Sequence, residues 1–92
     1  FGRNCVDPEQ LRALTDELRS IHGRERLLVS IDQEGGRVAR LRPPLWAGYP
    51  SGQAFEKLYE IAPASAVEAA RANATAMGLE LSAMGITVDY HP

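Results

Sequence analysis

The sequence has 92 residues, with 10 Lys+Arg against 12 Asp+Glu, 45% hydrophobic residues and one cysteine, a composition typical of a soluble globular protein. One cysteine cannot form an internal disulfide, and no Cys/His cluster suggests a structural zinc site. A formal net charge of −2 without a basic run argues against a nucleic-acid partner. No segment approaches the ~20 consecutive apolar residues that cross a bilayer, so we expect no membrane partner.

The first predicted element is a helix over residues 8–22. Asp7 suits the N-cap, Pro8 suits the first helical position, and Gln10 stands where a capping box places Glu or Gln. An apolar stripe at three- and four-residue steps follows, formed by Leu11, Leu14, Leu18 and Ile21. Gly23 is the expected stop.

A short strand and a long loop come next. Residues 27–31 form a nearly continuous apolar run, as in a parallel strand that is covered on both faces. Residues 32–50 are rich in glycine and proline and predict a loop, with a short extended excursion at 38–41. Within this loop, Trp46 and Tyr49 can either stack on a sugar or pack the loop onto the rest of the protein, and we favour packing.

Two helices and a second strand complete the chain. Ser51 predicts the cap of a short helix over residues 52–59. A longer alanine-rich helix is expected from residue 63 or 65 to about residue 84, with Gly85 as its stop. Residues 86–90 predict a second strand. Helices between two strands imply parallel pairing with crossover helices, and therefore an α/β fold.

Polar side chains are dense directly after the first predicted strand. Asp32, Glu34 and Arg37 lie within six residues, at the strand end where parallel α/β proteins place ligand sites. Asp32 can accept hydrogen bonds from sugar hydroxyls or hold a cation, and two carboxylates also suggest the acid and nucleophile of a glycosidase. The alternative is structural: Glu34 pairs with Arg37 or Arg40 and holds the loop.

Arg37 and His91 have open roles. Arg37 can reach a substrate carboxylate, but we favour a salt bridge to Glu34 or Asp32. Arg40 is expected at the loop surface. His91 follows the second strand, where it can line a cleft or serve as a hydrogen-bonded structural histidine.

Several motifs together resemble one enzyme family. They are residues 32–38 (Asp-Gln-Glu-Gly-Gly-Arg-Val), followed by Arg40 and Leu41, then residues 49–51 (Tyr-Pro-Ser) and residues 85–92 (Gly-Ile-Thr-Val-Asp-Tyr-His-Pro). This pattern resembles the amino-terminal barrel domain of glycoside hydrolase family 3, of the bacterial β-N-acetylglucosaminidase type. The likeness extends over essentially the whole sequence.

The resemblance implies a fold and an activity. Residues 1–92 are expected to be part of a single (β/α)₈ TIM-barrel domain, so that the remainder of the barrel is required. The implied reaction is retaining hydrolysis of terminal N-acetylglucosamine from peptidoglycan-derived saccharides. We expect no metal or cofactor, and a cytoplasmic location. A non-catalytic carbohydrate-binding or scaffolding module is the alternative.

The resemblance also assigns one residue. Asp32 matches the family aspartate that binds hydroxyls of the sugar in the −1 subsite, and Glu34, Arg37 and His91 are candidates for support of that site. The family nucleophile and acid/base residues match nothing in this sequence, so we expect no catalytic residue here. His91 departs from the alanine that many relatives carry before this proline.

Overall fold

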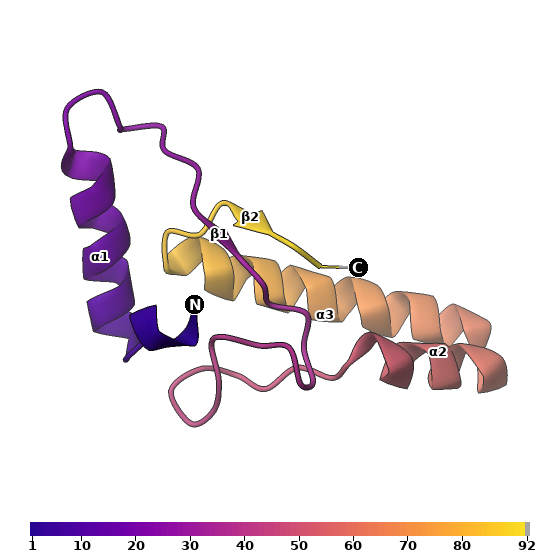
Figure 1. Ribbon diagram of the computed structural model, residues 1–92. Helices are drawn as coiled ribbons and strands as arrows, with labels where there is room; N and C mark the ends of the chain where they lie inside the picture. Colours follow the sequence, from indigo (N-terminus) through magenta and orange to yellow (C-terminus); the bar gives the residue numbers. More distant parts are fainter. Residues whose placement is uncertain (92) are drawn as a thin grey trace.

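The computed structural model describes residues 1–91. Its elements follow the chain in a helix, strand, helix, helix, strand order (Figure 1). They are a 3₁₀ turn η1 (Gly2–Asn4), α1 (Pro8–Ser20), β1 (Ser30–Ile31), α2 (Gly52–Ile61), α3 (Pro63–Ala83) and β2 (Val88–Asp89). The predicted α/β class is therefore confirmed, and none of the helices in residues 1–91 is long and apolar enough to cross a bilayer.

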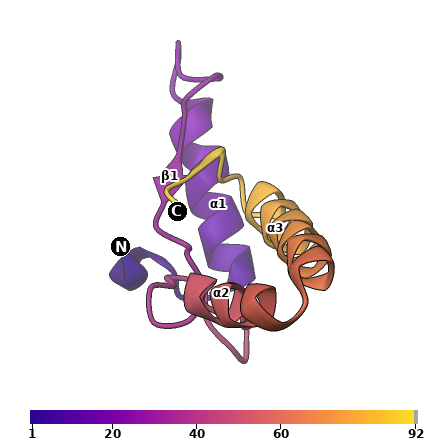
Figure 2. The ribbon, with the colours of Figure 1, turned by 90° about the vertical axis from the view of Figure 1, so that its right-hand side faces the viewer.

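The two strands form a parallel sheet. Ser30 lies opposite Val88, and Ile31 lies opposite Asp89. Both helices that connect the strands in sequence pack against each other, and α3 runs alongside the sheet (Figures 1 and 2). The carboxyl ends of β1 and β2 consequently point the same way, so the residues that follow each strand meet at one end of the sheet.

Both strands are shorter than the sequence predicts. At their start, the side chain of Thr87 replaces a backbone acceptor in the hydrogen bonds between the strands. The hydroxyl Oγ1 of Thr87 accepts a hydrogen bond from the Val29 N–H at 2.8 Å. The Val29 carbonyl in turn accepts hydrogen bonds from the N–H groups of both Thr87 and Val88. Regular strand pairing therefore begins only at Ser30.

The helix signals of α1 are confirmed at its start. The Asp7 carboxylate accepts the Gln10 N–H at 2.7 Å, and the Gln10 side chain accepts the Val6 N–H at 2.9 Å, a variant of the capping box. At the other end the helix stops at Ser20, two residues before the predicted end at residue 22, because Ile21 adopts an extended backbone.

The long helix α3 holds the loop that precedes α2. On α3, the Glu80 carboxylate accepts the Ala47 N–H at 3.2 Å. Burial raises the pKa of the Tyr49 hydroxyl, and the adjacent Glu80 carboxylate, to which it is hydrogen-bonded, raises it further. Trp46, which precedes these two residues, is buried in the core. The packing role predicted for the two aromatic residues is confirmed.

One apolar cluster joins the elements. It draws on α1, β1, the long loop, α3 and the turn before β2, and contains Leu11, Ile31, Leu41, Trp46, Met77, Leu81 and Ile86. The molecule is nevertheless elongated, with extents of 51 × 25 × 16 Å and a radius of gyration of 14.9 Å, against about 12 Å for a compact domain of this length. Its accessible surface of 6457 Å² likewise exceeds the roughly 5,000 Å² expected for this mass.

The end of α3 is closed by side chains from α1. The hydroxyl of Thr15, which is buried, donates to the Met84 carbonyl at 2.8 Å. Arg12 Nη1 donates to the Ala83 carbonyl at 3.0 Å. These bonds satisfy carbonyls that a helix end leaves without partners. Gly85 packs closely against Thr15, so that a Cβ atom at Gly85 would overlap the Thr15 side chain. Its φ is 81°.

Replacement of Gly85 by alanine tests this close approach, with Gly23 as a matched control. Both glycines have a φ of 81°, but a Cβ atom at Gly23 meets open space. We expect Gly23→Ala to lower the free energy of unfolding by about 1 kcal/mol through backbone strain, and Gly85→Ala to lower it by about 1–3 kcal/mol more through overpacking. Urea denaturation of the full-length protein measures both, and equal losses would contradict the contact.

Candidate functional site

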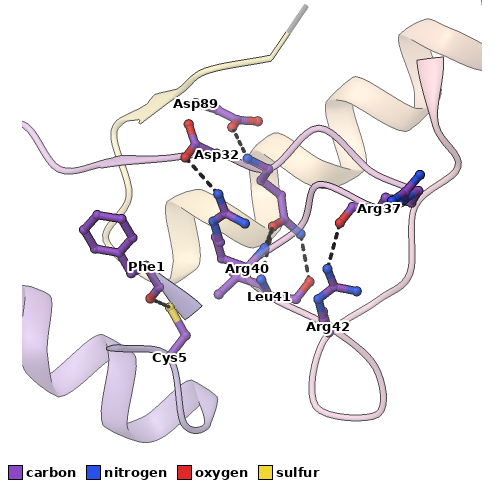
Figure 3. A network of polar contacts seen from close by, with 9 residues as sticks. Phe1, Cys5, Asp32, Arg37, Arg40, Leu41, Arg42 and Asp89 are labelled. Carbon is purple, nitrogen blue, oxygen red and sulfur yellow. Dashed lines mark hydrogen bonds and ion pairs between the residues drawn. The ribbon is translucent and has the colours of Figure 1, made fainter. Parts of the chain in front are cut away.

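The loop after β1 is organised around the side-chain amide of Gln33, which is 1% exposed. Its Oε1 accepts the N–H groups of Arg40 at 2.8 Å and Leu41 at 3.1 Å. Its Nε2 donates to the Leu41 carbonyl at 2.9 Å (Figure 3). A glutamine can do this because its amide carries both a donor and an acceptor. The returning loop is thus fixed against the strand end.

The backbone of the same residue ties the loop to the second strand. The Gln33 N–H donates to Asp89 Oδ1 at 2.8 Å (Figure 3). Burial raises the pKa of Asp89 above its usual range and the Asp32 carboxylate raises it further, while the Gln33 N–H and His91 partly offset both effects. Asp89 therefore acts as a structural acceptor between the two strands.

Two glycines make the turn at the tip of this loop. Gly35 and Gly36 have φ values of 88° and 59°, in the region that favours glycine. The Gly36 N–H donates to the Tyr49 carbonyl at 2.8 Å, and a Cβ atom at Gly35 would overlap the Pro50 carbonyl. The predicted turn role is confirmed. The predicted excursion at 38–41 amounts to an isolated bridge between Gly35 and Val38.

Asp32 stands at the carboxyl end of β1 and faces a pocket of about 180 Å³. Its Oδ2 accepts a hydrogen bond from Arg40 Nη2 at 3.2 Å, and its side chain is 49% exposed. Within residues 1–91, no hydrogen bond to Oδ1 is seen. Phe1, Ser30 and Tyr90 also line this pocket. The carboxylate is therefore accessible to a ligand through one oxygen.

The other predicted site residues lie elsewhere. Glu34, Arg37 and His91 line a separate pocket of about 370 Å³ beside the start of α2. The ion pairs predicted for Glu34 and for Arg37 are wrong. In the described loop after β1, the ion pair joins Asp32 and Arg40 instead. The glycine turn explains this, because it ends the alternation that would keep neighbouring side chains on one strand face.

Arg40 lies at the candidate site although the sequence does not predict it there. It was expected at the loop surface, but its side chain is only 32% exposed and contacts Asp32. Phe1 and Tyr90, which line the same pocket, were also missed. Arg40 lies eight residues after Asp32, and only closure of the loop brings the two together. No spacing rule for a helix or strand signals such a contact.

The residues present offer little to a metal ion. In the part of the chain that the structure describes, no group of three or more His, Cys, Asp and Glu side chains is placed to hold one. Asp32 alone supplies one or two oxygens, whereas a calcium ion takes six to eight. The arrangement suits an acceptor of hydrogen bonds from a neutral ligand better than a cation site.

The contribution of the Gln33 amide to stability is tested by Gln33→Met. Gln53→Met is the matched control, because Gln53 is exposed. Loss of three buried hydrogen bonds is expected to lower the free energy of unfolding by about 3 kcal/mol. Amide hydrogen exchange of Arg40 and Leu41 should accelerate in the full-length protein, while Gln53→Met changes neither quantity. Unchanged exchange in Gln33→Met would show that the loop is held by other contacts.

The raised pKa of Asp89 predicts that the stability of the protein depends on pH. Its pKa in the folded state is raised above 3.8, so the ionised form opposes folding, and this cost grows as the pH rises through the folded-state pKa. Asp89→Asn keeps an oxygen for the Gln33 N–H without the charge. The variant should therefore gain stability relative to the parent as the pH rises above 3.8, measured by denaturant unfolding. A relative loss over this range would contradict the prediction.

Comparisons with known proteins identify the family of this chain. A family model described as the glycosyl hydrolase family 3 N terminal domain matches residues 1–92. Over 92 residues the chain is 36% identical to the beta-hexosaminidase of Aromatoleum aromaticum, 38% to that of Alkalilimnicola ehrlichii and 39% to that of Xanthomonas euvesicatoria. Each match covers 100% of this chain and 26%, 26% and 27% of the respective relative. The chain therefore belongs to the glycosyl hydrolase family 3 N-terminal domain family.

Proposed function

We propose that this chain is part of a retaining β-N-acetylglucosaminidase that removes terminal N-acetylglucosamine from peptidoglycan-derived saccharides. Membership of the glycosyl hydrolase family 3 N-terminal domain family supports a glycosidase. The relatives named beta-hexosaminidase support an amino sugar as the substrate. Since the chain spans about a quarter of the length of these relatives, the proposed activity is that of the full-length protein.

We assign the binding of sugar hydroxyls in the −1 subsite to Asp32. The observation that carries this assignment is its carboxylate at the end of β1, half exposed to a pocket and bonded to protein at one oxygen only. An ionised carboxylate is purely an acceptor, and sugar hydroxyls are donors, so the free oxygen can form a strong charge-assisted hydrogen bond.

The pocket wall suits a sugar ring as well as its hydroxyls. Phe1 and Tyr90 line the pocket beside Asp32 and are 76% and 63% exposed. Aromatic faces offer flat apolar surface, and the tyrosine adds a hydroxyl that can hydrogen-bond. A carboxylate and two aromatic side chains on one pocket can orient a ligand that has both polar edges and apolar faces. Glu34, Arg37 and His91 are proposed to support the site from the neighbouring pocket.

We further propose that residues 1–92 contribute two strands and their helices to a (β/α)₈ barrel. The parallel pairing of β1 and β2 supports this arrangement, because it directs both strand ends to the face on which barrel enzymes carry their sites. The elongated shape and large accessible surface are consistent with further elements that cover this sheet. The nucleophile and the acid/base residue would come from those elements.

Asp32→Asn in the full-length protein tests the assignment, with Asp16→Asn as a matched control. Asp16 also pairs with an arginine, at 3.0 Å on the exposed face of α1. A charged hydrogen bond contributes about 1.5–3 kcal/mol, so kcat/KM for 4-nitrophenyl N-acetyl-β-D-glucosaminide should fall about 10- to 150-fold in Asp32→Asn. Asp16→Asn should match the parent enzyme.

Two outcomes would overturn the proposal. Unchanged kcat/KM in Asp32→Asn would remove Asp32 from the site. Absence of turnover by the parent protein, together with measurable binding of N-acetylglucosamine, would favour the non-catalytic carbohydrate-binding module instead.

A further inference from the structure

We propose that the pocket between η1 and the loop 39–46 binds a small organic oxyanion, a phosphate monoester or a carboxylate, at the guanidinium of Arg42. The pocket has a volume of about 410 Å³, which lies within the range of small-molecule sites. Apart from Arg40, its lining differs from that of the pocket at Asp32. The proposal therefore concerns a second site and goes beyond the proposed function.

The charged lining of this pocket is basic. Arg40 and Arg42 line it, and among the described residues that do so there is no aspartate or glutamate. Burial raises the pKa of the Cys5 thiol, which also lines the pocket, while the nearby Arg40 lowers it in part. Positive charge therefore acts on the pocket. An anion is favoured there, although the chain as a whole has a formal net charge of −2.

Arg42 has a charge and N–H groups that a ligand can use. Its Nη2 donates to the Arg37 carbonyl at 2.8 Å (Figure 3). Among residues 1–91, Arg42 forms no ion pair, whereas Arg40 pairs with Asp32. A guanidinium carries five N–H groups in a planar fork, which matches two oxygens of a carboxylate or a phosphate. Since a carbonyl leaves the charge of Arg42 uncompensated, an oxyanion suits its remaining N–H groups.

The walls of the pocket are held in place before a ligand binds. The Trp46 N–H donates to the Arg42 carbonyl at 3.1 Å, and Trp46 and Leu41, on either side of this turn, are 8% and 1% exposed. On the opposite wall, the Val6 N–H donates to the side chain of Gln10 on α1 at 2.9 Å. Walls that are already ordered lower the entropy cost of binding.

The rest of the lining favours an organic anion over a bare ion. It includes the apolar side chains of Val6, Ala39, Leu45 and Trp46. Val6 and Leu45 are 64% and 52% exposed, so their apolar surface is available to a ligand. Burial of such surface stabilises a complex with a ligand that has an apolar body, whereas inorganic phosphate has none. The ligand class is therefore a small molecule with one anionic group and an apolar part.

Titration of the full-length protein with phenyl phosphate and with benzoate tests the proposal, and benzamide is the neutral counterpart of benzoate. Isothermal titration calorimetry should show saturable binding of at least one of the two anions, weakened by added salt, and no binding of benzamide. The tighter anion identifies phosphate or carboxylate as the recognised group. Arg42→Met should raise the Kd at least about tenfold, because it removes hydrogen bonds to a charged group. Arg24→Met, in the exposed turn after α1, should match the parent.

A second pair of variants keeps the test decisive if Arg42→Met does not fold. Leu45→Glu should raise the Kd about tenfold, because the introduced carboxylate repels the ligand and pairs with Arg42, whereas Leu45→Gln should bind like the parent. The proposal is overturned if neither anion binds saturably, or if the parent, Arg42→Met and Leu45→Glu have equal Kd values.

Inhibition kinetics separate this pocket from the proposed substrate site. Phenyl phosphate at saturation should leave the KM for 4-nitrophenyl N-acetyl-β-D-glucosaminide unchanged. A competitive rise in KM would place the anion in the substrate site and overturn the proposal. Calorimetry requires no turnover, so an absence of turnover would refute the proposed function and leave the binding result standing.

Discussion

The buried amide of Gln33 is the interaction on which the arrangement of the candidate site depends. Three side-chain hydrogen bonds tie it to Arg40 and Leu41, and its backbone N–H reaches Asp89 on the second strand. An unsatisfied amide in this position would be strongly destabilising. The loop must therefore return to the strand end for the chain to fold, and this return brings Arg40 to the pocket.

Alternate side chains at the end of β1 point to the core and to the pocket. Ile31 and Gln33 are buried, whereas Asp32 between them is half exposed and faces the pocket. Successive side chains of a strand point to opposite faces, so packing of the core on one face leaves the carboxylate on the other.

In our proposal this chain provides a group that binds the substrate, and the chemistry lies in other parts of the protein. Such a division is common in barrel enzymes, where residues from the ends of several strands meet at one site. Contacts between α1 and the end of α3 hold the turn that leads into β2, since Thr15 and Arg12 donate hydrogen bonds to carbonyls at the end of α3.

The sequence by itself determined the elements, their order and the importance of Asp32 as a candidate, because caps, glycine stops and apolar runs are local signals. It did not determine the partner of Asp32, the separation of Glu34, Arg37 and His91 into another pocket, or the short length of the strands. Those features were decided by tertiary structure. They depend on a glycine turn and a buried amide that bring distant residues together, and no pattern of neighbouring residues encodes where such a loop will close.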